Sequence, residues 1–164
     1  MNKNSQQSDD IVFMREALRL AEHAASLGEV PVGALVVRNG QVIGRGFNQP
    51  VSSHDPTAHA EVRALRDAAE VVANYRLPDT TLYVTIEPCT MCLGAIIHAR
   101  VGRIVFGAPE PRYGALVSGQ KLLENGQFNH RPEVQGGILE TECGSLMKQF
   151  FAARRKQPGR VSEQ

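Results

Sequence analysis

Two short motifs carry side chains that can bind a metal ion. They read His59-Ala60-Glu61 and Pro88-Cys89-Thr90-Met91-Cys92. Each follows a loop or strand at a point where a helix is expected to begin, and two cysteines three residues apart share one face of a helix. The positive end of the helix dipole favours their thiolate form. With His59 as a third ligand, Cys89 and Cys92 predict one zinc ion with an open coordination position, which is typical of a catalytic site.

Glu61 is predicted to transfer protons and not to bind the metal. It lies two residues after His59, so it points to a different side of the helix. Zinc can activate a water molecule at neutral pH. Attack of that water on an amidine-like carbon of a base needs one proton removed from the water, one given to the ring nitrogen and one given to the departing ammonia. A single carboxylate can serve all three transfers.

Two other interpretations explain the motifs separately. Cys89 and Cys92 are compatible with a structural zinc knuckle, or with a thioredoxin-like Cys-x-x-Cys in which His59 is an ordinary helix-start histidine. The two motifs occur together, each at a helix start, with a predicted strand between them. This combination favours a catalytic zinc site.

The elements that must position these motifs follow from the spacing of apolar residues. Asp9 and Asp10 can cap a first helix that Gly28 ends, and Asn39-Gly40 is suited to a tight hairpin turn. The predicted order is a helix over 9–28, strands over 32–37 and 42–47, a helix over 59–72, a strand over 81–86, a helix over 88–99, strands over 103–108 and 134–139, and a helix containing 146–151.

Helices between strands imply crossover connections and a sheet covered on both faces, while the early hairpin makes the sheet mixed. We therefore predict a three-layer α/β/α sandwich with a mixed sheet of about five strands. The length of 164 residues with 42% apolar content suits one domain, expected over 9–156, with disordered ends at 1–8 and 157–164. No apolar run approaches the roughly 18 residues of a membrane span, and no signal peptide is apparent, so a cytoplasmic location without membrane contact is expected.

A cluster of basic residues marks the C-terminal end, although the net charge is only +1. The segment 144–162 contains five basic and no acidic side chains, namely Lys148, Arg154, Arg155, Lys156 and Arg160. Such a cluster is compatible with nucleic-acid phosphates and with a solvated helix end, where cations are also favourable.

At these motifs the chain resembles the cytidine and deoxycytidylate deaminase superfamily, and more closely the bacterial tRNA-specific adenosine deaminases. The likeness runs from about Met14 to Arg155. Its densest stretches are Glu29-Val30-Pro31-Val32-Gly33-Ala34, His54-Asp55-Pro56-Thr57-Ala58-His59-Ala60-Glu61 and Met91-Cys92-Leu93-Gly94-Ala95-Ile96-Ile97-His98-Ala99-Arg100.

The resemblance implies conversion of the wobble adenosine of a tRNA anticodon to inosine, after the base is flipped into the site. It implies that zinc is held by His59, Cys89 and Cys92, with Glu61 as the proton shuttle. The residues expected to contact the anticodon stem-loop are Asn48, Val30 and Ala60 at the base and Arg154, Arg155 and Lys156 at phosphates. A homodimer is expected, and no other protein partner.

One loop departs from the family's pattern. An aspartate and a lysine usually stand after the fourth strand, whereas this chain has Glu110, Pro111, Arg112 and Tyr113. Two alternatives to tRNA deamination remain at this point. A free-base or nucleoside deaminase, of the guanine or cytosine type, would carry the same zinc motifs, and a non-catalytic zinc or RNA-binding scaffold would have no need of Glu61.

Overall fold

The computed structural model of the chain describes residues 2–157. The elements in chain order are α1 (Lys3–Ser26), β1 (Gly33–Arg38), β2 (Gln41–Phe47), α2 (Pro50–Ser53), α3 (Ala60–Val72), β3 (Thr81–Ile86), α4 (Thr90–His98), β4 (Arg103–Ala108), α5 (Leu122–Asn125), β5 (Glu133–Gln135) and α6 (Glu140–Arg155). No helix within 2–157 is both long and apolar enough to cross a membrane.

The strands form one mixed sheet in the order β2-β1-β3-β4-β5. β1 pairs antiparallel with β2 and β3, whereas the β3–β4 and β4–β5 pairs are parallel. Asn39 and Gly40 have φ angles of 51° and 72°, the positive values that a two-residue hairpin turn requires. The predicted fold class, with its mixed five-stranded sheet, is confirmed.

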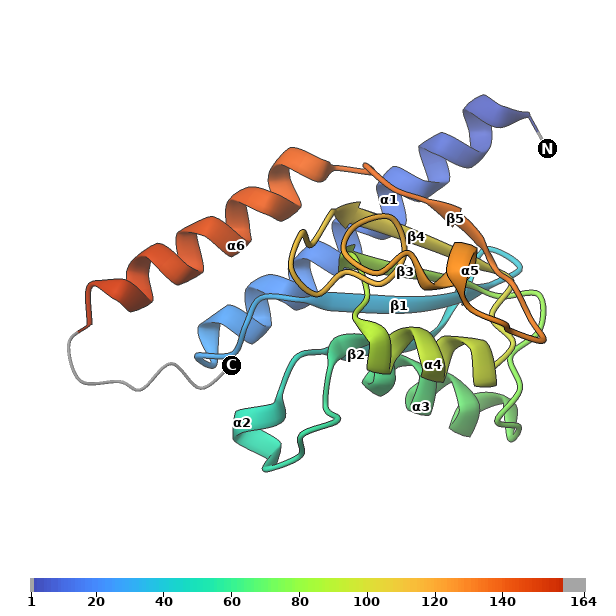
Figure 1. The fold of residues 1–164 in the computed structure, drawn as a ribbon, viewed down its shortest axis with the longest axis horizontal. Helices are drawn as coiled ribbons and strands as arrows, with labels where there is room; N and C mark the ends of the chain where they lie inside the picture. The colour runs from blue at the N-terminus through green and yellow to red at the C-terminus, as the bar shows by residue number, and fades with distance from the viewer. Residues whose placement is uncertain (1, 158–164) are drawn as a thin grey trace.

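Helices cover both faces of the sheet: α1 and α6 lie on one side, and α3 and α4 on the other (Figure 1). Glycine in β2 allows α3 to approach the strand closely. A Cβ at Gly46 would lie 2.3 Å from the carbonyl oxygen of Ala60 and 2.5 Å from the amide nitrogen of Ala64. The first turn of α3, which carries Glu61, is therefore seated directly on the backbone of β2.

The prediction for the N-terminal end was wrong. α1 begins at Lys3, with Asn2 as its N-cap, so residues 3–8 are helical where disorder was expected. Asp10 does not cap the helix. It is 2% exposed, accepts two hydrogen bonds from the Arg103 guanidinium at 2.8 and 2.7 Å and one from the Tyr83 hydroxyl at 2.8 Å. An inward-facing carboxylate with these partners favours continuation of the helix through this position.

Three further differences concern element boundaries. Cys89, and not Pro88, directly precedes α4 and is its N-cap. The short helices α2 and α5 lie in segments for which no helix was predicted. β5 has only three residues, shorter than the strand predicted over 134–139. Beyond its end Gly137 adopts a positive φ of 86°, and the Ile138 amide still donates to the Phe106 carbonyl of β4. A disordered tail was expected over 157–164. Residues 158–164, including Arg160, lie outside the described residues.

Candidate metal and catalytic site

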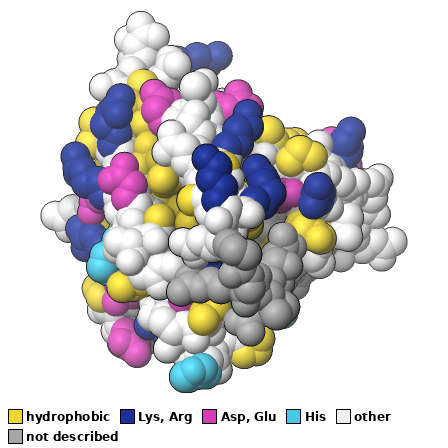
Figure 2. Space-filling view, turned by 90° about the vertical axis from the view of Figure 1, so that its left-hand side faces the viewer, with side chains coloured by type: hydrophobic (Ala, Val, Ile, Leu, Met, Phe, Trp, Pro, Cys, Tyr) yellow, Lys and Arg dark blue, Asp and Glu magenta, His cyan; other side chains and the backbone are white. Residues whose placement is uncertain are grey.

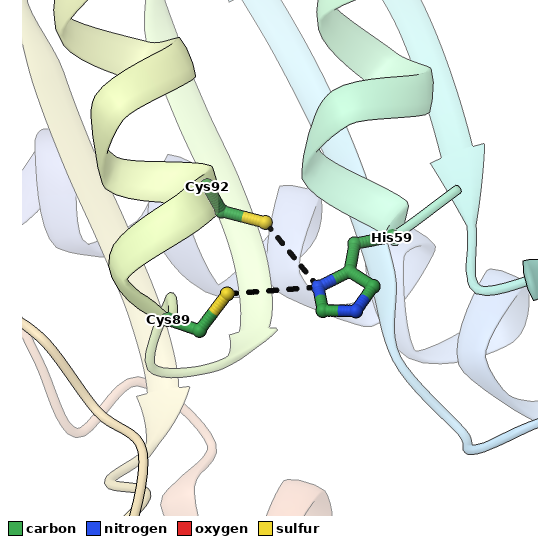
Figure 3. A group of neighbouring side chains, drawn as sticks. All are labelled: His59, Cys89 and Cys92. Carbon is green, nitrogen blue, oxygen red and sulfur yellow. Dashed lines mark hydrogen bonds between the residues drawn. The ribbon is translucent and has the colours of Figure 1, made fainter. Parts of the chain in front are cut away.

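The candidate metal ligands come from two helix starts that face each other. His59 is the N-cap of α3 and Cys89 is the N-cap of α4, both with extended backbone angles, and Cys92 follows in the first turn of α4. The side chains of all three residues point toward one another (Figure 3). The ligand atoms of these three residues lie within 4.8 Å of one another, and Cys92 is fully buried.

The distances in this group fit a tetrahedral zinc ion. The Nδ1 atom of His59 lies 3.7 Å from Cys89 Sγ and 3.5 Å from Cys92 Sγ. With zinc–sulfur bonds of about 2.3 Å and zinc–nitrogen bonds of about 2.0 Å, a tetrahedral angle separates sulfur from nitrogen by about 3.5 Å. One imidazole nitrogen and two sulfurs are also the donor types that zinc prefers. A fourth position is left open in this set.

The pKa values of the two thiols are shifted in opposite directions. A hydrogen bond from Cys92 lowers the pKa of the Cys89 thiol to about 4, and the same contact together with burial raises the pKa of Cys92. The hydrogen bond with Cys89 raises the pKa of His59, against the effect of burial. Zinc takes thiolates and neutral imidazole, so metal binding at this group releases protons.

Glu61 lies in the first turn of α3 and is not a member of the ligand group. Its side chain is 4% exposed. Burial raises the pKa of its carboxyl above the usual value, while the charge of His59 acts in the opposite direction. A carboxyl whose pKa is raised above its usual value is better suited to accept and return protons during a reaction.

The residues predicted to contact the base lie around the start of α3. Asn48 follows β2, is 8% exposed, and its Oδ1 accepts a hydrogen bond from the Ala60 amide at 2.8 Å. Val30 is partly buried and packs on the hydrophobic core. Ala60 is fully buried, so its side chain is core and its backbone faces Asn48. Asn48 therefore joins the end of β2 to the helix that carries His59 and Glu61.

The sequence analysis missed two buried glutamates beside these residues. Glu29 is 2% exposed, and its carboxylate accepts from the amides of Val51 and Ser52 and from the Ser52 hydroxyl, at 3.2, 2.8 and 2.7 Å. These amides are at the start of α2, so Glu29 caps that helix. It thereby anchors the segment that leads to His59. The signal in the sequence is weak, because the acceptor and its donors are more than twenty residues apart.

The second missed glutamate is Glu87, directly before Pro88 and 3% exposed. Its carboxylate accepts hydrogen bonds from the loop that departs from the family pattern and from the residues that follow it. Burial raises the pKa of Glu87, but hydrogen bonds from Ser118, Val117 and Glu110 bring it below the usual value. In the same loop, Glu110 Oε1 accepts from the amides of Arg112 and Tyr113, at 2.8 and 3.4 Å.

The basic residues at the end of α6 are not equivalent. The Arg154 guanidinium donates a hydrogen bond to the Gly28 carbonyl and lies over the ring of Phe150 at 4.6 Å, whereas Arg155 and Lys156 are exposed. Figure 2 views the end of the molecule where α6 finishes and shows several Lys and Arg side chains close together, with acidic side chains among them. Within residues 2–157, no hydrogen bond joins the basic residues of α6 to the candidate metal ligands, so the two features are separate in the structure.

Comparisons with known proteins show the family of the chain. A model of the MafB19-like deaminase family matches residues 8–155. The tRNA-specific adenosine deaminase of Haemophilus influenzae is 48% identical over 149 residues, covering 90% of this chain and 86% of that protein. A solved structure from a study of A-to-I editing by tRNA:A34 deaminases has a TM-score of 0.80 at 42% identity, covering 82% of this chain and 97% of that one. A guanine deaminase structure from Nitrosomonas europaea, at 23% identity and a TM-score of 0.76 over 87% of this chain and 84% of that one, shows a shared fold alone.

Proposed function

The chain belongs to the tRNA-specific adenosine deaminase family, and from that membership and the site we propose that it hydrolyses the wobble adenosine of a tRNA anticodon to inosine with the help of zinc. The single observation that carries the proposal is the triangle of His59, Cys89 and Cys92, whose nitrogen and sulfurs are spaced for a tetrahedral zinc ion. The identity of 48% to a tRNA-specific adenosine deaminase supports the substrate, since the guanine deaminase shares only 23%.

When bound at this site, zinc would activate a water molecule as the nucleophile. Glu61 supplies the proton transfers. Its carboxylate takes a proton from the attacking water and gives it to N1 of the adenine ring as the water oxygen bonds to C6. Glu61 then carries the second proton of the water to the exocyclic nitrogen, which leaves as ammonia. Adenosine and water are thus converted to inosine and ammonia.

The flipped base is proposed to lie between Val30 and the start of α3. Since Asn48 Oδ1 already accepts from the Ala60 amide, the side-chain Nδ2 is the atom oriented to donate to an acceptor on the base. Val30 would contact the face of the ring, and the backbone of Ala60 would face its edge. These three contacts are to the base alone. Discrimination between an adenosine in RNA and a free base therefore also needs contacts to the rest of the anticodon.

We also propose the assembly and the wider contacts of the enzyme. We propose one deaminase domain over residues 9–156, with the first residues of α1 before it, and the family match over 8–155 supports this proposal. The partner is the anticodon stem-loop, with Arg154, Arg155 and Lys156 placed near its phosphates. The enzyme is proposed to act as a cytoplasmic homodimer, with anticodon contacts from both subunits.

The test is incubation of the protein with an anticodon stem-loop that has adenosine at the wobble position, followed by analysis of the nucleosides. Inosine is the expected product, and guanine and cytosine offered as free bases are expected to remain unchanged. Glu61→Ala is the matched inactive variant, since it should keep zinc and RNA binding but lose turnover by about three orders of magnitude. Conversion of a free base without inosine formation would favour the guanine or cytosine type, and RNA binding without any product would favour a scaffold.

A further inference from the structure

Glu87 lies directly before the segment that carries the candidate metal ligands Cys89 and Cys92. It is the residue between the end of β3 and the Pro88-Cys89 step, and its backbone amide donates to the Ala108 carbonyl at 2.9 Å, which extends the pairing of β3 with β4. Its side chain is almost fully buried, at 3% exposure. The position of this carboxylate is therefore set by the same backbone that sets the position of Cys89.

Five hydrogen bonds from one loop end on this carboxylate. Oε2 accepts from the successive amides of Leu116, Val117 and Ser118, at 3.0, 2.9 and 3.0 Å. Oε1 accepts from the Glu110 amide at 3.1 Å and from the Ser118 hydroxyl at 2.6 Å. Backbone amides that converge on one anion form a strong, directional site, and each bond to a charged acceptor is stronger than one to a neutral acceptor.

The loop over residues 110–118 is held by Glu87 and by two of its own residues, Ala115 and Leu116, which are 0% and 4% exposed and belong to the hydrophobic core. Its residues form no helix or strand, although Gly114 packs so tightly that a Cβ there would lie 2.5 Å from the Glu87 carboxyl carbon. Tyr113 and Val117 on this loop are 61% and 49% exposed. The loop, gold between β4 and α5 in Figure 1, thus takes its shape around Glu87 and presents apolar side chains to solvent.

The same loop lies directly against the segment that carries the metal ligands. The Ala115 amide donates to the Pro88 carbonyl at 2.9 Å, and the Thr90 hydroxyl donates to Gln120 Oε1 at 2.9 Å. A shift of the loop would therefore change the surface beside Cys89.

We propose that Glu87 is a positioning residue, whose carboxylate holds the loop over residues 110–118 in the shape that binds the RNA beside the metal site. It does not touch the reacting atoms. The expected effect of Glu87 on KM rests on the proposed function, whereas its effect on the shape of the loop does not.

Glu87→Gln is the informative variant, because an amide has the same shape but turns an N–H group toward backbone donors. Amides of Leu116, Val117 and Ser118 should exchange with deuterium at least about tenfold faster than in the wild type. The KM for the stem-loop should rise about tenfold, while zinc stays at one per chain and the single-turnover rate at saturating RNA changes less than about threefold. Glu124→Gln, an exposed carboxylate just after the loop, is the matched control and should change none of these quantities.

The proposal would be overturned if the three amides exchanged at the wild-type rate, or if the single-turnover rate fell by as large a factor as KM rose. Loss of zinc from a variant whose loop amides stay protected would also overturn it. If Glu87→Gln does not fold, Ser118→Ala is the second variant, because it removes one of the five hydrogen bonds. Its loop amides should exchange about threefold faster than in the wild type, and its KM for the stem-loop should rise about threefold. No shift in Ser118→Ala would then count against the proposal. Absence of inosine with the wild type would refute the proposed function, while the exchange measurement would still decide the role of Glu87.

Discussion

The side-chain Oδ1 of Asn48 accepts a hydrogen bond from the Ala60 amide at 2.8 Å. Ala60 is the first residue of α3, and the N-cap residue His59 provides no side-chain cap. Asn48, the residue after β2, therefore caps the helix from outside it, which leaves the His59 imidazole free to point toward the two cysteines. Capping and the proposed contact with the base use different atoms of the same amide group.

Two substitutions of Asn48 should separate these roles. Asn48→Asp keeps an oxygen for the Ala60 amide, so its unfolding free energy should remain near that of the wild type, but it loses the N–H donor and should lose activity. Asn48→Ala removes both groups and should also lose about 1 kcal/mol of stability. Chemical denaturation and the inosine assay measure the two effects, and full activity in Asn48→Asp would show that the amide donor does not read the base.

The cysteines of the candidate metal group should differ from Cys143 in their effect on zinc. Cys89→Ser and Cys92→Ser each remove one of three protein ligands, so metal analysis should find less than about a tenth of the wild-type zinc. Cys143 is 1% exposed in the core on α6 and provides the control. Cys143→Ser should keep one zinc per chain, and full zinc in either of the first two variants would refute the ligand assignment.

Arg154 should behave differently from its neighbours on α6. Arg155→Gln with Lys156→Gln removes two exposed cations and should flatten the slope of log affinity against log salt by about 1.4, at about 0.7 for each phosphate contact on single-stranded RNA. Arg154→Gln removes the hydrogen bond to the Gly28 carbonyl and the contact with the Phe150 ring, so it should also lower the thermal unfolding temperature. The measurements are RNA binding over a salt series and thermal unfolding. An unchanged affinity and slope in the double variant would identify this end of α6 as a solvated helix end.

The buried ion pair between Asp10 and Arg103 should contribute to stability and not to catalysis. The Asp10 and Arg103 side chains are 3% and 15% exposed, and Asp10→Asn would leave a buried guanidinium without its charged partner. The expected cost is about 3 kcal/mol of unfolding free energy. Asp9→Asn, at the neighbouring exposed position, is the control and should change stability by less than about 0.5 kcal/mol. Equal stabilities of the two variants would contradict the role of the pair.

The sequence by itself determined the chemistry of the candidate site and the order of the elements that carry it. His59, Glu61, Cys89 and Cys92 were predicted from residue type and spacing, because a helix start and a three-residue spacing are local properties. The fold class followed for the same reason, since apolar periodicity within each segment distinguishes helices from strands.

Only the tertiary structure decided which polar groups become buried partners, beside that site and elsewhere in the fold. Glu87 accepts from amides 23 to 31 residues away, Arg154 donates to a carbonyl 126 residues away, and Asp10 binds Arg103 across 93 residues. No periodicity relates such positions, and a charged residue in a sequence is most often exposed. These side chains become buried partners because the packing of helices and loops on the sheet brings donors and acceptors together, where an unpaired charge would be too unfavourable to remain.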